Sequence, residues 1–561
     1  MVVTLWLVPV LAVPLLLAAL VLWPTMRAHA LAMLPWAPLP ALAAALAAPA
    51  GVALGVPSVL LDMRLALDGP MRTMLGFAAL VWCLAGLFAR THLRDDPRRV
   101  RFAALWLLTL AGSLGVIVAA DVATFYAAFA CLSLAAYPLV VHTRTTAARR
   151  AGTVYIALAV LGEACLLAAF VVATGSADSL AIVDVRAALG DGVGREAALA
   201  LLIVGFGIKM GMVPLHVWLP LAHPAAPTAA SAMLSGVLVK AGVVGLMQFL
   251  PDVAAPDAQA ILLWAGLAGA YYGAALGLCQ RDPKAVLAYS TVSQMGLVIA
   301  LLALLPGHDA RGEVLDGVVL YSVHHGLAKA ALFLGVGVAL AAGGGRVGRA
   351  VLLALCVPAL SLAGAPLTAG AVAKTGAKAL LGDGTGGALF AASAVGTALL
   401  LMRFLWLLRG QQIQDAPSTP AAGLVLPWGA SVVAMCALPW WLGGSGDVTT
   451  LAYQLRPGTL GDGLWPIVAA LATGWLVSRW STRGLPRVPE GDLLWPLAAG
   501  MRGGVRCWAR WVAELPRPAP GRVARLRRLP WRRWSEATER ALSRWPVAGT
   551  LLILVSLALV R

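Results

Sequence analysis

The chain has 561 residues, of which 60% are hydrophobic and 12% are charged, with a formal net charge of +17. Soluble globular proteins carry about 25% charged residues, so this composition, with a mean hydropathy of +0.85, excludes a soluble fold. The seven scattered cysteines form no CxxC pair and no metal-binding spacing. No iron–sulfur, haem, flavin or nucleotide motif is visible either. We therefore expect no cofactor and no bound metal, and any electron transfer would belong to another chain.

Apolar runs of about 20 residues, long enough to cross a bilayer, recur along the whole chain. They predict an all-α integral membrane protein with about 14–16 transmembrane helices. No small-residue cleavage site follows the first run, so we interpret that run as a retained helix. The expected spans are 4–22, 36–57, 70–89, 102–120, 122–141, 151–174, 197–219, 226–250, 258–279, 286–306, 314–342, 350–376, 386–408, 421–443, 462–478 and 545–560.

The loops between these spans alternate in charge. Residues 90–101 hold five arginines and residues 142–150 hold three, and basic residues also mark 281–284, 346–349 and 403–409. The intervening loops, at 178–196, 252–257 and 309–316, are acidic or mixed. The positive-inside rule places the basic set in the cytoplasm, which puts both termini on the outer side and predicts a multi-pass protein of the bacterial cytoplasmic (inner) membrane.

Residues 479–544 differ from the rest of the chain. They contain 15 arginines against five acids, interleaved with tryptophan, leucine and proline. Such a pattern favours amphipathic pieces along the cytoplasmic membrane face. We interpret the segment as a lateral strut that touches anionic lipid or neighbouring subunits, with a long basic loop as the alternative. Its position between two expected spans argues against nucleic-acid binding. A final transmembrane helix would occupy 545–561.

Lysine is rare in this chain, with six among 42 basic residues. Lys209, Lys240 and Lys329 fall near the middle of expected spans, where a charge costs about 2.5–3.5 kcal/mol. A buried lysine can release its proton near neutral pH, whereas arginine stays protonated. We therefore interpret these three lysines as proton carriers, with a fixed structural ion pair as the alternative. Lys284 and Lys378 lie near span ends, where snorkelling to the interface explains them.

Proline interrupts two of the spans that carry lysine. Pro214 and Pro220 flank the sequence LHVWL just after Lys209, and each proline removes a backbone donor and opens the helix. Residues 361–378 repeat the pattern with Pro366 followed by Lys374. Irregular backbone at membrane depth is tolerated where it is buried in protein or lines a wet cavity. Two such breaks, each near a lysine, indicate two related halves with an ion path near the midplane.

The segment around the first break resembles a known family. Residues 205–245 read GFGIKMGMVPLHVWLPLAHPAAPTAASAMLSGVLVKAGVVG. This wording is similar to the signature of the antiporter-like proton-channel family, which includes complex I subunits L, M and N, the large Mrp antiporter subunits and membrane subunits of energy-converting hydrogenases. It is most similar to the branch of hydrogenase-4 component B and formate hydrogenlyase subunit 3. DPKAVLAYSTVSQMG at 282–296 and HHGLAKAALFLGVG at 324–337 also match, and the resemblance covers about residues 60–410.

The resemblance implies two inverted five-helix repeats, each a half-channel with one broken helix. They would occupy 102–250 and 258–408, flanked by transmembrane helices at 1–101 and 421–478. By motif, Lys209 and Lys374 correspond to the two broken-helix lysines, with Lys374 facing the outlet. Lys240 corresponds to the lysine of the helix after the first break, and His325 with Lys329 to the central pair. Secondary candidates are His216 and His223 in the matched loop, which also suit a structural role, and His324, which has no counterpart.

The chain departs from the family pattern in the fifth span. The family has a glutamate where this chain has Ala130 in TFYAAFACLSL, which puts pumping by the first half in doubt. Glu163, the acid placed deepest in any expected span, is a candidate substitute, and a protonated, hydrogen-bonded Glu163 is the alternative. Leu221 replaces a family acid, and Gln294 replaces a family histidine.

The sequence as a whole predicts a proton-translocating, antiporter-like membrane subunit of a multisubunit energy-converting complex. Buried lysine, histidine and glutamate side chains, with water, would carry the proton. Its partners would be other membrane subunits, a peripheral coupling module and membrane lipid. The alternatives are an Mrp-type Na⁺/H⁺ antiporter subunit, which an acid-poor core disfavours because hard cations prefer oxygen ligands, and a non-pumping scaffold or subunit of an inorganic-carbon uptake complex.

Overall fold

The computed structural model describes residues 2–443, 448, 450–480, 486 and 488–493. The chain divides into two units, one of residues 1–54 and 64–491 and one of residues 55–63 and 492–561. All of the helices described below belong to the first unit. Most of the expected lateral segment 479–544 and the whole of the expected span 545–560 lie outside the described residues.

Helices form nearly all of the regular structure in the part of the chain that is described. In chain order the elements are α1 (Val2–Leu22), α2 (Arg27–Met33), a 3₁₀ turn (Leu34–Trp36), α3 (Leu39–Ala47), β1 (Val52–Val56), β2 (Met63–Leu67), α4 (Gly69–His92), α5 (Arg99–Val118), α6 (Val122–Val140), α7 (Thr146–Thr174), α8 (Ile182–Asp191), α9 (Arg195–Met210), α10 (Trp218–Ala225), α11 (Thr228–Met233), a π-helical turn (Leu234–Leu238), α12 (Lys240–Phe249), α13 (Pro256–Leu278), α14 (Pro283–Leu302), α15 (Arg311–Ala342), α16 (Gly345–Ala363), α17 (Ala369–Leu381), α18 (Thr385–Gln412), α19 (Ala422–Leu442), α20 (Leu451–Gln454) and α21 (Pro457–Trp480).

Within the described residues, twelve helical stretches are long and apolar enough to cross a membrane, and Trp6–Leu22 is a shorter apolar helix. The expected all-α membrane protein is therefore confirmed. The stretch 197–219 is not among the twelve because the chain breaks inside it, leaving α9 and α10 too short.

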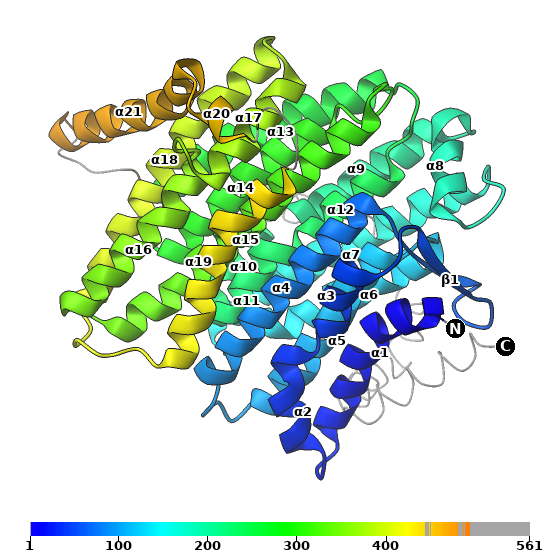
Figure 1. Ribbon diagram of the computed structural model, residues 1–561, viewed down its shortest axis with the longest axis horizontal. Helices are drawn as coiled ribbons and strands as arrows, with labels where there is room; N and C mark the ends of the chain where they lie inside the picture. The colour runs from blue at the N-terminus through cyan, green and yellow to red at the C-terminus, as the bar shows by residue number, and fades with distance from the viewer. Residues whose placement is uncertain (1, 444–447, 449, 481–485, 487, 494–561) are drawn as a thin grey trace, which may run out of the picture. The chain divides into compact units, whose positions relative to one another are not determined.

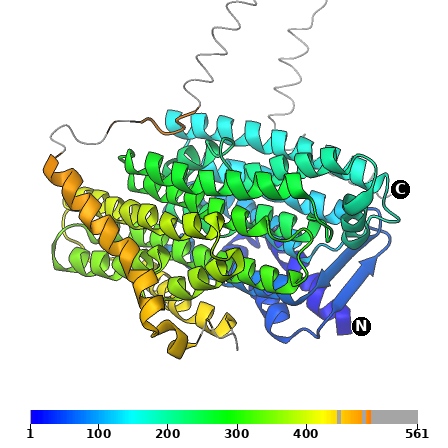
Figure 2. The same ribbon diagram turned by 90° about the horizontal axis from the view of Figure 1, so that it is seen from above.

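The most deeply buried helices lie at the centre of the first unit. The apolar windows of Thr228–Phe249 and Pro283–Leu302 are 100% buried, and that of Arg311–Ala342 is 89% buried. Figure 1 shows α14 and α15 between α16, α18 and α19 on one side and α4 to α7 on the other. In the view turned by 90° (Figure 2), the orange helix α21 crosses its neighbours at a steep angle, and it packs against α18. Side chains on α12, α14 and α15 are consequently held away from lipid.

Close glycine contacts fix the first helix pair of each expected repeat. A Cβ added at Gly112 of α5 would lie 2.5 Å from the backbone nitrogen of Leu132 in α6. A Cβ at Gly266 of α13 would lie 2.5 Å from the carbonyl oxygen of Gly296 in α14. Inside a bilayer the hydrophobic effect does not drive helices together, so they associate by close packing, and small residues such as glycine allow the backbones to approach.

One expected span differs from the structure, whereas the helix break expected within 361–378 is present. Helix α3 ends at Ala47, and residues 52–56 pair with 63–67 as a two-stranded sheet, so the expected span 36–57 is wrong in its second half. Pro49 and Gly51 are poor helix formers and explain this end. The expected span 350–376 is interrupted between α16 and α17, where Gly364 has φ +86° and Pro366 follows.

Candidate functional site

The first helix break separates α9 from α10. Gly211 ends α9 in the left-handed region with φ +76°, where glycine carries no steric penalty. Trp218, the first residue of α10, donates its Nε1–H to the carbonyl oxygen of Ile208 at 2.8 Å, so the freed end of α9 is partly satisfied. Pro214 lies inside the break as expected. Pro220 lies instead in the first turn of α10, where proline is tolerated.

Lys209 lies two residues before this break and is only 6% exposed. Its Nζ donates to Ser133 Oγ at 2.9 Å and lies 5.4 Å from the ring centre of Phe129 and 5.9 Å from that of Tyr155. Such contacts compensate part of the cost of a buried ammonium group. Lys209 is thus held by α6 and α7, the helices that carry Ala130 and Glu163.

Glu163 is buried close to this lysine. Its charge interacts with that of Lys209, and its carboxyl group contacts Ser133, although no direct ion pair joins Glu163 and Lys209. Ser133 lies one helical turn after Ala130, on the same face of α6. The sequence interpretation missed Ser133. Ser133 could have been identified from the sequence, because it lies three residues after Ala130, the position at which the family has a glutamate.

The second lysine follows a π-helical turn between α11 and α12. This wider turn, a form found often at functional sites, places the carbonyl oxygen of Ser235 3.0 Å from Lys240 Nζ. The same Nζ lies 2.6 Å from His325 Nδ1 on α15. Lys240 is 2% exposed and His325 is fully buried. The structure therefore joins the two central candidates directly, across the boundary between the two expected repeats.

Lys329 lies one turn after His325 and is also fully buried. Its Nζ donates to the carbonyl oxygen of Leu287 at 2.8 Å. Thr291 Oγ1 donates to the same carbonyl at 3.0 Å and lies 2.6 Å from Ser235 Oγ. A second polar route through α14 thus connects the surroundings of Lys240 with Lys329. Ser235 and Thr291 were not predicted, although hydroxyl residues inside an expected apolar span are visible in the sequence.

His324 connects α15 with the second helix break. Its Nε2 lies 2.9 Å from Ser361 Oγ, which also accepts the backbone N–H of Gly370 at 3.1 Å. The charge of His324 interacts with those of His325 and Lys374. His324, a secondary candidate in the sequence analysis, therefore lies between the central pair of His325 and Lys329 and the lysine of the second break, Lys374.

Lys374 lies after the second break, in α17, whereas Lys209 precedes the first. Its Nζ reaches back to the carbonyl oxygen of Ala363, the last residue of α16, at 3.0 Å. Lys374 is half-buried and lines a cavity of about 60 Å³, together with Lys378 and Asp462. Lys378 Nζ pairs with Asp462 Oδ2 at 2.7 Å, which agrees with a structural role for this lysine at a span end.

The remaining histidines and Gln294 occupy less central places. His223 is fully buried and stacks on Phe333 with ring centres 4.7 Å apart. His216 packs edge-on to Tyr272 at 5.2 Å. Gln294 donates to Thr397 Oγ1 at 2.9 Å and accepts from Tyr321 OH at 2.9 Å. Its amide therefore ties α14 to α15 and α18.

Several buried polar atoms along this path have no protein partner. They include Glu163 Oε1, both ring nitrogens of His223, the hydroxyls of Ser290, Ser293 and Ser322, and His325 Nε2. Buried polar groups are normally satisfied by protein or by ordered water. A cavity of about 10 Å³ beside Lys240 and Ser113 is close to the minimum volume that holds one water molecule. Ordered water is the expected partner of these atoms, although none of them lines this cavity.

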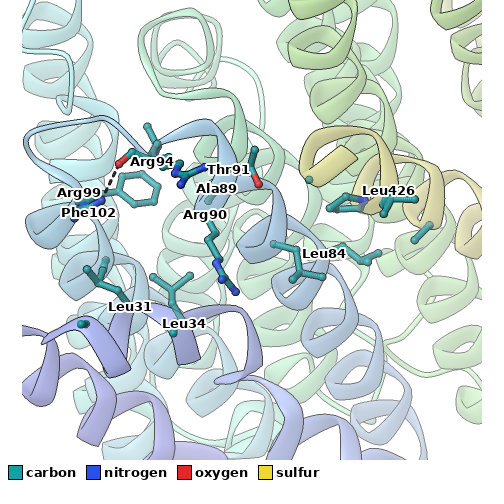
Figure 3. A pocket seen from close by; sticks show the side chains of 18 residues that line it. Leu31, Leu34, Leu84, Ala89, Arg90, Thr91, Arg94, Arg99, Phe102 and Leu426 are labelled. Atoms are coloured by element: carbon teal, nitrogen blue, oxygen red, sulfur yellow. Dashed lines mark hydrogen bonds between the residues drawn. The ribbon is translucent and has the colours of Figure 1, made fainter. Parts of the chain in front are cut away.

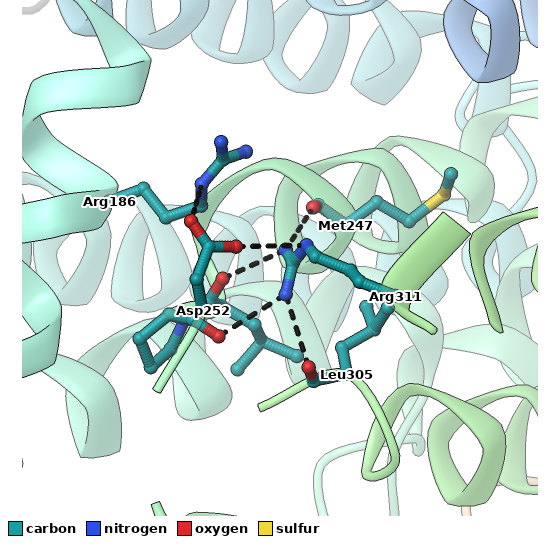
Figure 4. Close-up of polar contacts among 7 residues, drawn as sticks. Arg186, Met247, Asp252, Leu305 and Arg311 are labelled. Carbon is teal, nitrogen blue, oxygen red and sulfur yellow. Dashed lines mark hydrogen bonds and ion pairs between the residues drawn. The ribbon is translucent and has the colours of Figure 1, made fainter. Parts of the chain in front are cut away.

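An arginine cluster clamps the end of the helix that carries Lys240 (Figure 4). Arg311, the first residue of α15, donates to the carbonyl oxygens of Met247 and Leu250 at 3.1 and 3.0 Å, at the C-terminal end of α12. Asp252 pairs with Arg311 at 3.1 Å and with Arg186 of α8 at 3.1 Å. The clamp fixes α12 against α15 beyond the Lys240–His325 contact.

The arrangement can move a proton between nitrogen and oxygen atoms inside an apolar core. The candidate titratable groups are Lys209, Lys240, His325, Lys329, His324 and Lys374, and of these Lys240 and His325 are in direct contact. No hydrogen bond joins Lys209 to Lys240, although α9 and α12 pack together, with Gly242 against Phe206 and Met210. Within the described residues, no three His, Cys, Asp or Glu side chains converge as a metal-binding set.

The structure thus defines a polytopic membrane protein with a buried row of titratable side chains between two broken helices. Residues 119–400 match the family described as NADH:quinone oxidoreductase/Mrp antiporter, TM, and the chain belongs to this family.

The chain also resembles individual proteins. It is 31% identical over 290 residues to hydrogenase-4 component B of Escherichia coli (strain K12), covering 49% of this chain and 43% of that protein. It is 32% identical over 298 residues to NADH-quinone oxidoreductase subunit M of Pseudomonas aeruginosa, covering 49% and 55%. The chain thus spans about half the length of the curated relatives it matches.

Solved structures show the same fold. A chain in the structure of the Mrp complex from Dietzia sp. DQ12-45-1b matches with a TM-score of 0.68 and 24% identity, over 82% of this chain and 99% of that chain. A chain of the archaeal membrane-bound sulfane sulfur reductase matches with a TM-score of 0.66 and 19% identity. At these identities the likeness establishes the fold alone.

Proposed function

We propose that this chain translocates protons as an antiporter-like subunit of a multisubunit energy-converting complex of the hydrogenase-4, formate hydrogenlyase or complex I type. Its place would be the bacterial cytoplasmic membrane, with other membrane subunits and a peripheral coupling module as partners. The observation that carries the proposal is the 2.6 Å contact between Lys240 Nζ and His325 Nδ1 in the fully buried centre of the fold.

This contact supports a defined proton step. Lys240 in its ammonium form gives a proton to His325 Nδ1, and the imidazolium then releases the proton on Nε2. Nε2 has no protein partner, so it is free to hand the proton through water towards Lys329 or His324. The charges of Lys240 and Lys329 both act on His325, and their repulsion favours a single mobile positive charge over two fixed ones.

The second break would supply the outlet. Lys374 lies beside a small cavity and interacts with His324, so a proton that reaches His324 has a titratable acceptor near the end of α16. Glu163 and Ser133 would take the role of the family glutamate at the first break, because both lie against Lys209.

The test is proton uptake, followed by quenching of a pH-sensitive acridine dye, in inverted membrane vesicles that contain the whole complex. Lys240→Met removes the charge and should abolish uptake. Lys240→Arg keeps the charge but cannot release its proton, so it should lower uptake nearly as far. Lys378→Arg is the matched control and should retain uptake, because Lys378 forms an ion pair with Asp462. Native gels and the redox activity of the complex report assembly.

The outcome separates the alternatives. Full uptake by an assembled Lys240→Arg complex would favour the scaffold, since a structural charge needs only a cation. Uptake that requires Na⁺ in the medium would favour the Mrp-type Na⁺/H⁺ antiporter, whereas equal uptake in K⁺ medium supports proton transport alone.

A further inference from the structure

A cavity of about 870 Å³ lies away from the row of lysines, between α2, α4, α5 and α19 (Figure 3). Its volume falls within the range of roughly 300–1,000 Å³ typical of pockets that hold small molecules. Part of its wall is open at the surface, because Leu426 of α19 is 70% exposed. No side chain assigned above to proton transfer lines it.

The wall of this cavity has two chemically different parts. Leu31, Leu34, Leu84 and Leu426 provide apolar surface, and Arg90, Arg94 and Arg99 provide positive charge. Arg90 lies in the last turn of α4, and Arg99 is the first residue of α5. Arg90 and Arg99 therefore stand at the ends of two transmembrane helices, and Arg94 lies in the loop between them. Lipid headgroups would lie at this depth, and the leucines would extend into the hydrocarbon region.

The positive charge in the cavity is not compensated by this part of the protein. Within the described residues, Arg90, Arg94 and Arg99 form no ion pair, and Arg99 donates only to the carbonyl oxygen of Arg94, at 2.8 Å. The acids closest in sequence to these arginines are Asp95, which is exposed, and Asp96. The carboxylate of Asp96 already has other partners. Its Oδ2 lies 2.9 Å from His142 Nε2 and its Oδ1 accepts the backbone N–H of Arg98. A ligand that completes this cavity must supply negative charge.

We propose that the cavity binds an anionic phospholipid from the leaflet on the basic side of the protein. The phosphate would lie among Arg90, Arg94 and Arg99, because guanidinium groups match phosphate oxygens with paired hydrogen bonds. The acyl chains would run along the leucines between α2 and α19. Basic pockets between transmembrane helices are suited to such headgroups, and a zwitterionic lipid lacks the net charge that the arginines require.

The experiment uses the whole complex in nanodiscs of phosphatidylcholine that contain a small fraction of photoactivatable cardiolipin. Crosslinked peptides are mapped by mass spectrometry, and photoactivatable phosphatidylcholine serves as the reference probe. We expect cardiolipin, but not the reference probe, to label peptides of α4, α5 and α19 that line the cavity. Arg90→Gln with Arg94→Gln should lower this labelling about tenfold or more, since each basic residue near an anionic surface contributes about a factor of five.

A second variant tests the apolar part of the cavity while the arginines remain. Ala430→Trp, at an exposed lining position on α19, should also lower cardiolipin labelling. The matched controls lie on α16, outside the cavity, where Arg346, Arg349 and Ala350 are exposed. Arg346→Gln with Arg349→Gln, and Ala350→Trp, should leave the labelling unchanged. Equal labelling by both probes, no labelling of these peptides, or unchanged labelling in the double arginine variant of an assembled complex would each overturn the proposal.

Discussion

Lys240 and His325 are separated by 85 residues in sequence, yet Lys240 Nζ lies 2.6 Å from His325 Nδ1. Lys240 begins α12, at the end of the first expected repeat, and His325 lies in the middle of α15, in the second. The contact makes the centre of the protein a junction between two halves. A change of charge on either side chain therefore changes the electrostatic potential at the other.

This junction predicts strong coupling between the two residues. His325→Ala and Lys240→Met should each lower proton uptake about tenfold or more, because a buried hydrogen bond to a charged group contributes about 1.5–3 kcal/mol. The double variant should be no slower than the slower single variant, since both remove the same step. Initial uptake rates in vesicles with equal amounts of assembled complex provide the measurement. Losses that multiply would show that the two side chains act in separate steps.

The surroundings of Lys209 predict how the chain tolerates Ala130. Glu163→Gln should lower proton uptake without loss of assembly, and Ser133→Ala should lower it less, because Lys209 then loses one hydrogen bond but keeps the carboxylate nearby. Adding Ala130→Glu to the Glu163→Gln variant should restore part of the uptake. Asp178→Asn, at an exposed acid of the loop after α7, is the control. Normal uptake in Glu163→Gln would assign this glutamate to packing.

The arginine clamp predicts that substitutions of its two arginines, Arg311 and Arg186, lower the stability of the protein by different amounts. Arg311 is only 17% exposed and contacts Asp252 as well as the end of α12, whereas Arg186 is 26% exposed and makes a single contact with Asp252. Arg311→Met leaves buried carbonyl groups without a charged donor, which should cost at least about 1.5–3 kcal/mol. Arg186→Gln should cost less than about 1 kcal/mol. Thermal denaturation of the purified complex measures both, and equal melting temperatures for the two variants would contradict this account of the clamp.

Glu490 predicts a pH-dependent contact outside the membrane-spanning helices. Burial, reinforced by Asp282 and opposed by Arg150, raises the pKa of Glu490 to about 7, compared with about 4.3 for a free glutamate. Because the folded pKa is the higher one, this group's contribution to stability is present below about pH 4.3 and is lost as the pH rises through about 7. The segment 488–493, whose Val488 carbonyl accepts from Gln280 Nε2 at 3.4 Å, should therefore loosen between about pH 5 and pH 8.

Hydrogen exchange of residues 488–493 measures this effect. Comparison of the parent with Glu490→Gln at each pH cancels the intrinsic pH dependence of exchange. The variant should show protection that changes little with pH, whereas the parent should lose protection towards pH 8. Glu196→Gln, at an exposed acid in the first turn of α9, is the control and should behave as the parent does. The same loss of protection in Glu490→Gln would assign the pH response to another group.

The sequence by itself determined the class of fold and the identity of the titratable groups. Apolar runs of about 20 residues predict spans directly, because a bilayer of fixed thickness accepts few other structures. Lys209, Lys240 and Lys329 were recognised as functional candidates for an equally local reason, because a charged residue within such a run is energetically costly and is usually functional. The positions of both helix breaks followed from proline and glycine, which act on their own turn of helix.

Only the tertiary structure decided which groups meet. The sequence suggested Glu163 as a substitute for the family glutamate, but it could not show that Ser133 contacts Lys209. Nor could it pair Lys240 with His325 or place His324 between the central pair and Lys374. It also could not show that Arg311 clamps α12, or that Arg90 and Arg94 face the leucines of α2 and α19 across a cavity. Each of these relationships joins residues on different helices, and their separation depends on how the helices cross and rotate. That geometry is set by packing along whole helices, such as the glycine contacts of α5 with α6 and of α13 with α14, and not by the local sequence around any one functional residue.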